Sequence, residues 1–239
     1  MKKYAITVKN LTIKYKPIAK FNLKKFSFTK SIKTKTAIDN ISFKIEKGSS
    51  YGILGKNGSG KSTLLRALAG IYSIENGSIN LHNQSISLLS LGIGFKSYLT
   101  GYENILLSGM LMGFDKKIII DKIDEIIAFA DIGEYIYEPV RTYSSGMYSR
   151  LSFAITVILE SDIILIDEIL SVGDAFFKEK SKNKIKELTK NNNKTIIIVS
   201  HDFQTLRELT NKTIWLENGK IKEINETNKI IENYKTYYK

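Results

Sequence analysis

The chain has 239 residues, of which 43% are hydrophobic and 25% charged, and it contains no cysteine. This composition is that of a globular protein long enough to bury a full core, and the lack of cysteine excludes disulfides and thiolate metal sites. No apolar stretch approaches the roughly 20 residues that cross a bilayer, and residues 1–7 lack the apolar segment of a signal peptide. We therefore expect a protein of the cytosol, or one held at a membrane by a partner.

The formal net charge is +12. A charge of this size could indicate a nucleic-acid partner or anionic lipid. However, only four of the 36 basic residues are arginine, and Asn and Ile are abundant, as codon bias in an AT-rich genome would produce. We favour codon bias over a surface built for polyanions, and we expect no nucleic-acid partner.

Two strands are predicted near the start of the chain, where residues 5–13 and 37–45 alternate between apolar and polar side chains. The segment between them, residues 16–37, carries seven lysines and no acid. We interpret this region as two strands around a basic insertion. The insertion could approach lipid headgroups or a membrane partner, or it could be a solvated loop.

A glycine-rich loop follows the apolar stretch 51–54 and precedes the helix-forming run 64–69. It reads Gly55-Lys56-Asn57-Gly58-Ser59-Gly60-Lys61-Ser62-Thr63, which matches the phosphate-binding pattern G-x-x-x-x-G-K-[ST]. The glycines let backbone N–H groups wrap around a triphosphate, and the helix start adds its dipole. Lys61 is expected to reach the β- and γ-phosphates, and the Ser62 hydroxyl to ligate Mg²⁺. A chance resemblance of a Gly-rich turn is the alternative, but the flanking strand and helix favour binding of ATP or GTP.

The middle of the chain is predicted to be helical. After a turn at 75–77 and a short strand at 78–81, apolar residues within 102–138 recur at helical spacing until Pro139. A second helix is expected from about 146 to 159. We interpret this region as a helical subdomain inserted into a sheet-containing core.

Two later segments are continuous apolar runs rich in β-branched residues, at 163–166 and 195–199, typical of strands buried on both faces of a parallel sheet. A charged helix near 175–190 lies between them. Residues 214–221 predict a hairpin with an Asn-Gly turn, and 226–239 a polar, helical tail. Strands that alternate with helices imply an α/β fold with right-handed crossovers.

Polar side chains follow both apolar runs. Asp167 and Glu168 come directly after 163–166, at the sheet edge where the phosphate loop also lies. Asp167 can hold Mg²⁺, and Glu168 can orient or deprotonate an attacking water. His201 follows 195–199 and could bond the γ-phosphate. The alternatives are two solvated acids and a structural histidine.

The stretch Thr142-Tyr143-Ser144-Ser145-Gly146-Met147 precedes the second predicted helix. A Ser-Ser-Gly sequence at this place could be an ordinary helix cap or an anion site made by helix N–H groups. Taken alone, the motif does not decide between them.

Taken together and in this order, these motifs resemble the ABC-type ATPase family over nearly the whole chain. The resemblance implies a P-loop α/β core with a mixed sheet, an N-terminal antiparallel β part and an inserted helical subdomain. We expect one ATPase domain over 1–239, with the core at about 1–90 and 155–225, the helical subdomain at about 95–155 and a short tail at 226–239.

The resemblance also assigns residues. Tyr143-Ser144-Ser145-Gly146-Met147 stands where the family has its Leu-Ser-Gly-Gly-Gln signature, and Arg150 matches the arginine that usually follows. Asp174 matches the carboxylate of the dimerisation loop. Tyr15 matches the aromatic that stacks on adenine, which favours ATP over GTP; the alternative is a surface aromatic after a strand.

Within the family, the stretches 91–95, 99–105, 143–151 and 172–174 look like those of ATPases that export O-antigen, capsule or teichoic acid. The basic insertion fits that subgroup, and so does a chain that ends near residue 239 without the extra sugar-binding domain of some members. Two departures stand out. Residues 90–96 hold no glutamine for sensing Mg²⁺, and the second signature position is Ser145 instead of glycine. We expect the larger side chain of Ser145 to weaken the phosphate contact.

The family mechanism implies a head-to-tail homodimer around two ATP molecules, in which Ser144 and Gly146 of one copy meet the γ-phosphate held by Lys61 of the other. It also implies a separately encoded membrane permease that contacts the glycan, with the ATPase at the cytoplasmic face of the membrane. The alternatives are the ATPase of another ABC transporter and a non-transport ABC ATPase.

Overall fold

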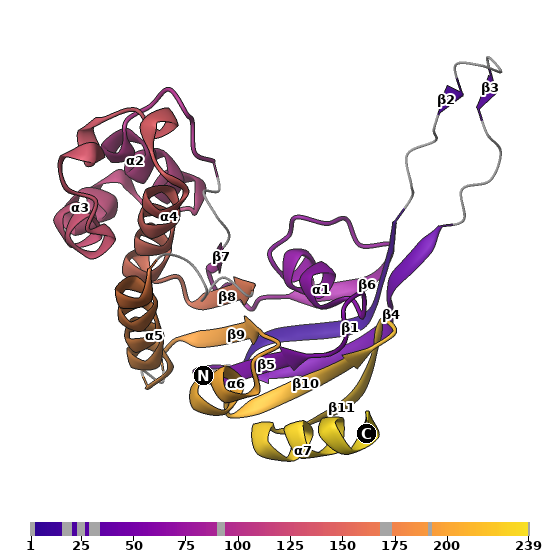
Figure 1. Cartoon of the computed structure of the whole chain (residues 1–239). Helices are drawn as coiled ribbons and strands as arrows, with labels where there is room; N and C mark the ends of the chain where they lie inside the picture. Colours follow the sequence, from indigo (N-terminus) through magenta and orange to yellow (C-terminus); the bar gives the residue numbers. More distant parts are fainter. Residues whose placement is uncertain are drawn as a thin grey trace.

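The computed structural model describes residues 3–15, 21–22, 27–28, 34–89, 94–167, 174–190 and 193–238. Several residues that were singled out from the sequence lie outside the described residues, namely residues 91–93, Glu168 and residues 172–173, as does most of the basic insertion. Figure 1 shows a layered body of strands with helices α2 (Gly101–Leu111), α3 (Lys116–Ala130) and α4 (Ser145–Leu159) gathered on one side and α7 (Thr227–Tyr237) on another.

The central sheet has six strands in the order β11-β10-β5-β9-β8-β7. Its members are β5 (Ser50–Leu54), β7 (Ile86–Leu89), β8 (Ile163–Asp167), β9 (Thr195–Val199), β10 (Lys212–Glu217) and β11 (Lys220–Glu226). All neighbours pair in parallel except β10 and β11, which form the predicted hairpin. Its turn residues Asn218 and Gly219 both have positive φ, as a two-residue hairpin turn requires.

A second, antiparallel sheet has the order β4-β1-β6. It contains the two strands predicted at the start of the chain, β1 (Tyr4–Tyr15) and β4 (Lys35–Glu46), together with β6 (Asn76–Asn80). The turn predicted at 75–77 is wrong in part, because β6 already begins at Asn76. Within the basic insertion, β2 (Phe21–Asn22) and β3 (Ser27–Phe28) form a separate two-stranded sheet.

The predicted helical block consists of several elements. They are α2 (Gly101–Leu111), α3 (Lys116–Ala130), two short 3₁₀ helices, η1 (Gly133–Tyr137) and η2 (Val140–Thr142), and α4 (Ser145–Leu159). The stripe Ile119, Ile123 and Ile126 is buried, as its helical spacing predicts. No helix among the described residues is both long and apolar enough to cross a membrane.

The central strands divide the interior into two apolar clusters. Ile164 and Ile166 of β8 pack with α3, α4 and α5 (Ala175–Lys190), whereas Ile163 and Leu165 pack with β1, β4 and α1 (Lys61–Leu68). Successive side chains of a strand point to opposite faces, so a strand covered on both faces must be apolar throughout. This confirms the prediction that 163–166 and 195–199 are strands buried on both faces.

A third, smaller cluster holds the end of the chain. The helix α7 (Thr227–Tyr237) buries Ile230 and Ile231 against Leu54 and Trp215, and α6 (Phe203–Leu209) adds Leu206. Figure 1 shows α7 lying along β10 and β11. The predicted helical tail is confirmed, and it packs directly behind the strand that leads into the glycine-rich loop.

Candidate nucleotide site

The glycine-rich loop connects β5 to α1, and its conformation depends on glycine. Gly58 and Gly60 have φ of 79° and 106°, and a Cβ on Gly60 would lie 2.6 Å from the carbonyl oxygen of Ala37. A Cβ on Gly55 would lie 2.2 Å from the carbonyl oxygen of Leu216. A side chain at Gly55 or Gly60 would therefore strain the loop, since backbone oxygens cannot give way cheaply. The loop therefore forms a tight turn between β5 and α1 that depends on its glycines.

Lys61 is held at the base of this loop. Its Nζ donates hydrogen bonds to the carbonyl oxygens of Gly55 at 2.8 Å and Lys56 at 3.1 Å, and the side chain is 7% exposed. These bonds hold a positive charge inside the turn at the start of α1, where helix N–H groups also favour an anion. The geometry fits the predicted role of Lys61 as a phosphate-binding cation.

Ser62 and Asp167 lie together, as predicted. The Ser62 hydroxyl donates a hydrogen bond of 3.2 Å to Oδ1 of Asp167. The sheet order explains this contact, because β5 and β8 flank β9 and all three strands end at the same edge. A hydroxyl beside a carboxylate is a ligand pair of the kind that Mg²⁺ prefers.

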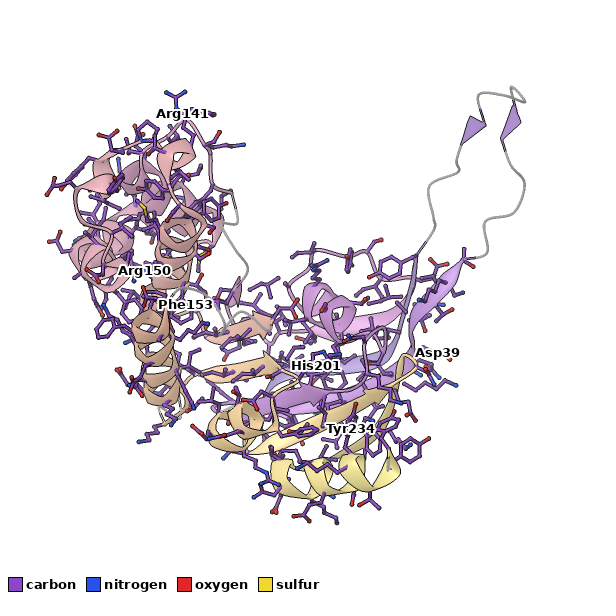
Figure 2. The ribbon with its side chains drawn as sticks, viewed as in Figure 1. Asp39, Arg141, Arg150, Phe153, His201 and Tyr234 are labelled. Atoms are coloured by element: carbon purple, nitrogen blue, oxygen red, sulfur yellow. The ribbon has the colours of Figure 1, made fainter. Side chains whose placement is uncertain are left out.

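A pocket of about 340 Å³ opens over the loop. Its lining comprises loop residues Asn57, Gly58 and 60–63, together with Tyr15, Lys35, Ala37 and His201. His201 stands at the end of β9, near the centre of the molecule in Figure 2. The pocket thus unites Tyr15, the loop and His201, three of the features that the sequence singled out.

Tyr15 contacts the loop through its hydroxyl group. Its hydroxyl lies 2.7 Å from Oγ1 of Thr63, and its ring packs edge-on against Tyr72 at 5.7 Å between centroids. Arg66 donates to the Tyr72 hydroxyl at 3.2 Å. Burial raises the pKa of Tyr15, so the phenol stays neutral. Tyr15 is 37% exposed, which leaves part of the ring open to the pocket.

The Ser-Ser-Gly stretch lies at the start of α4. Ser144 caps this helix, and its Oγ accepts a hydrogen bond of 3.2 Å from the Met147 N–H. Ser144, Ser145, Gly146 and Met147 line a second pocket, of about 490 Å³, together with Ser149, Arg150 and Asp174. This pocket shares no lining residue with the first. Figure 2 shows Arg150 on the helical side of the molecule, away from His201.

Arg150 joins α4 to the start of α5. Its guanidinium forms an ion pair with Asp174 and donates a hydrogen bond of 2.9 Å to the carbonyl oxygen of Asp131. Asp174 also accepts the N–H of Phe177 at 2.9 Å, which caps α5. The Phe177 N–H and the Arg150 guanidinium both lower the pKa of Asp174. Within one chain, Asp174 therefore shapes the second pocket, a contact that the sequence did not indicate.

The residues present fit a magnesium–triphosphate group. Within the part of the chain that the structure describes, the buried Ser59 Oγ has no hydrogen-bond partner, and the same loop holds the Lys61 ammonium against the Gly55 carbonyl oxygen. Among the described residues, no group of three His, Asp or Glu side chains could hold a metal by itself. The pair Ser62 and Asp167 would thus share Mg²⁺ with phosphate oxygens and water, which is how this ion usually binds.

Comparison with known proteins gives a consistent set of relatives. A family model described as ABC transporter matches residues 38–171. The chain is 42% identical over 200 residues to the O-antigen export system ATP-binding protein RfbB of Myxococcus xanthus, covering 84% of this chain and 46% of that protein. It is 41% identical over 239 residues to the teichoic acids export ATP-binding protein TagH of Bacillus anthracis, covering 99% of this chain and 43% of that protein. The chain thus spans less than half the length of these two relatives.

The fold is similar to those of solved ATP-binding cassettes. A dimeric cassette bound to ADP and Pi superimposes with a TM-score of 0.75 at 21% identity, covering 93% of this chain and 98% of that chain. The ATP-binding subunit of an ABC transporter gives a TM-score of 0.76 at 17% identity, covering 96% of this chain and 93% of that chain. At this identity the likeness concerns the fold, and it agrees with the predicted α/β class.

Proposed function

Since the chain belongs to the ABC transporter family, we propose that it is the ATP-binding and ATP-hydrolysing subunit of a transporter that exports a surface polysaccharide or a lipid-linked glycan. The observation that carries the ATPase part is the Ser62–Asp167 pair beside the Lys61 loop. The export part is supported by the names of relatives about 41% identical to the chain, which describe export of O-antigen and teichoic acids.

The proposed chemistry divides among residues of the first pocket and two acids that follow one another in the chain. Lys61 and the loop N–H groups bind the phosphates, and Ser62 and Asp167 would hold Mg²⁺, which would supply positive charge to offset the negative charge developing on the phosphate oxygens. His201 bonds the γ-phosphate and helps to position water. Glu168, which lies outside the described residues, is proposed to orient or deprotonate that water.

We propose that two copies assemble head to tail. The signature residues Ser144 and Gly146 line a pocket separate from the phosphate loop. If the signature contacts ATP, the contact therefore needs a second chain. ATP would then hold the dimer together and hydrolysis would release it, which gives two states that can drive a membrane partner.

The remaining proposals concern partners and place. We propose a separately encoded permease with several membrane spans, which makes most of the contact with the glycan. The ATPase would sit against it at the cytoplasmic face of the membrane, where ATP is available. The family membership and the export relatives support this arrangement.

The test is to tag the Glu168→Gln variant, solubilise native membranes in detergent, purify the protein with ATP and identify what accompanies it by mass spectrometry. A multi-span membrane protein in equal amount supports the transporter proposal. Lys61→Ala, which should bind no nucleotide at physiological ATP, is the matched control and should form no ATP-dependent dimer. Recovery with ribosomal proteins, or alone from the soluble fraction, would contradict the proposal.

A further inference from the structure

The β10–β11 hairpin contacts the backbone of the phosphate loop. The Gly219 N–H donates a hydrogen bond of 3.0 Å to the Ser59 carbonyl oxygen, and Gly219 in turn accepts one of 2.9 Å from Asp39 N–H. The Leu216 carbonyl oxygen stands against Gly55. The loop is thus enclosed by backbone groups from a hairpin more than 150 positions later in the chain, and its shape depends on where that hairpin lies.

The end of α7 extends this contact to a side chain of the loop. The Tyr238 hydroxyl donates a hydrogen bond to the Glu217 carboxylate at the hairpin, and Lys56 Nζ lies 3.6 Å from the centroid of the Tyr238 ring. An ammonium over an aromatic face is attracted by the ring quadrupole. Lys56 also accepts the Lys61 Nζ hydrogen bond, through its carbonyl oxygen, at 3.1 Å. A continuous set of contacts therefore joins Tyr238 to Lys56 and Lys56 to Lys61.

Tyr238 is itself firmly anchored. Its ring packs against Tyr234 at 4.8 Å between centroids and lies 6.2 Å from Trp215, and α7 is fixed by the buried Ile230 and Ile231. Figure 2 shows Tyr234 between α7 and the sheet. These contacts make the position of the Tyr238 ring follow the position of α7.

The charges at this junction favour the contact at neutral pH. The hydrogen bond from Tyr238, followed by that from Lys222, lowers the pKa of Glu217, and the charge of Lys56 acts in the same direction. The neighbouring carboxylate raises the pKa of Tyr238 well above its usual value. Tyr238 consequently remains a neutral donor and Glu217 an ionised acceptor.

We propose that Tyr238 is a positioning residue of the nucleotide site. With Glu217 it fixes Lys56, and through the Lys56 carbonyl it sets the place of the Lys61 ammonium, so that a displacement of α7 changes the affinity of the loop for nucleotide. This inference rests on the proposed function, because it assumes that the loop binds MgATP.

Three variants of the whole chain separate this role from a merely structural one. Tyr238→Leu removes the ring and the hydroxyl, and Tyr238→Phe keeps the ring over Lys56. Thr236→Ala removes a nearby exposed side chain whose hydroxyl donates to the Glu232 carbonyl oxygen within α7. Loss of a partly exposed cation–π contact and a charge-assisted hydrogen bond predicts that Tyr238→Leu raises the Kd for MgATP by about 3- to 10-fold. Tyr238→Phe should give a smaller increase, and Thr236→Ala should match the wild type.

A double-variant cycle with Lys56→Met tests the route through Lys56. If Tyr238 acts through Lys56, adding Tyr238→Leu to Lys56→Met leaves the Kd unchanged. Equal fold-changes in both backgrounds, or a wild-type Kd in Tyr238→Leu, would overturn the inference.

Amide hydrogen exchange of residues 55–61 in nucleotide-free protein supplies a second readout. Tyr238→Leu should speed exchange in the loop, whereas Thr236→Ala should not, and equal protection of the loop in the two variants contradicts the inference. A wild-type protein that fails to bind MgATP but shows this exchange pattern would contradict the proposed function and leave the link between α7 and the loop standing.

Discussion

The Ser62 hydroxyl lies 3.2 Å from a carboxylate oxygen of Asp167, although 105 positions separate the two residues in the chain. The contact exists because β5 and β8 lie on either side of β9 and end at one edge of the sheet. The two residues are not close in sequence, so their contact depends on the strand order of the central sheet.

The first prediction concerns this pair. Asp167→Asn removes the anionic oxygen that would face Mg²⁺, and we expect the affinity for ATP in the presence of Mg²⁺ to fall by about 10- to 100-fold. Affinity measured in EDTA should change little, because the loop N–H groups and Lys61 are retained. Titration with a fluorescent ATP analogue, with and without Mg²⁺, checks this. An unchanged Mg²⁺ enhancement in the variant would show that Asp167 does not hold the ion.

The second prediction compares two loop glycines with positive φ. Gly60→Ala would strain the backbone and place a Cβ 2.6 Å from the Ala37 carbonyl oxygen, so we expect the free energy of unfolding to fall by about 2–4 kcal/mol. Gly58→Ala is the control, since a Cβ there meets nothing within 4 Å, and strain alone should cost about 1 kcal/mol. Urea unfolding measures both. Equal losses of unfolding free energy in the two variants would mean that the contact with the Ala37 carbonyl oxygen does not destabilise Gly60→Ala.

The third prediction concerns Tyr15. If its ring stacks on adenine, Tyr15→Leu should weaken ATP binding by about 10-fold, the effect of losing one aromatic–base contact. Tyr15→Phe should retain ATP affinity, even though it loses the hydrogen bond to Thr63. Isothermal titration of the two variants separates stacking from the hydrogen bond. A larger loss in Tyr15→Phe than in Tyr15→Leu is the contrary outcome.

The fourth prediction concerns pH. Glu208 of α6 bonds Lys182 and Lys186 of α5, each at 2.8 Å, and these bonds lower its pKa to about 2. Because the folded-state pKa is depressed, the stabilisation is present above the unfolded-state pKa near 4.5 and disappears as the pH falls towards about 2. Glu208→Gln should therefore unfold at a lower temperature than the wild type at pH 7.

The pH series itself checks the sign of that effect. The difference in Tm between wild type and Glu208→Gln should be constant from pH 7 to 5 and shrink below about pH 4.5. Glu187→Gln is the control on α5, since Glu187 pairs with Lys184 at the longer distance of 3.4 Å and its side chain is 71% exposed. A difference that grows on acidification would rule out the stabilising role of the Glu208 carboxylate.

The parts of the fold that the sequence predicted are those with local causes. The loop 55–63 has its glycines where positive φ and close approach demand them, and the runs 163–166 and 195–199 are apolar because both faces are covered. The hairpin at Asn218-Gly219 follows from its turn chemistry. Each of these features can be deduced from neighbours within a few residues.

The parts that were missed depend on distant partners. The strand β7 contains Ser87 among apolar residues and shows no periodicity, and within the described residues it pairs with β8. Three further contacts join segments that are far apart in sequence. They are the hydrogen bond between Tyr15 and Thr63, the ion pair of Arg150 with Asp174 and the hydrogen bond from Gly219 N–H to the Ser59 carbonyl oxygen. Spacing along one chain gives no signal for such contacts, because they arise only when the sheets assemble.

The continuous apolar character of β8 and β9 has a consequence for how the sheet finds its alignment. A strand whose residues are apolar on both faces would bury similar surface after sliding by one position, so hydrophobicity does not select the alignment. The alignment of β8 with β7 is instead selected by Ser85 and Asp162, which lie just before these two strands. The Asp162 carboxylate accepts a hydrogen bond of 2.9 Å from Ser85 N–H, and Asp162 N–H donates one of 2.9 Å to Ser85 Oγ. A slip of one residue would break these bonds, carry Asp167 about 3.3 Å along the strand and turn it to the opposite face, away from Ser62. The direction of the Asp167 carboxylate thus depends on Ser85 and Asp162, which lie just before β7 and β8, at the opposite end of these strands.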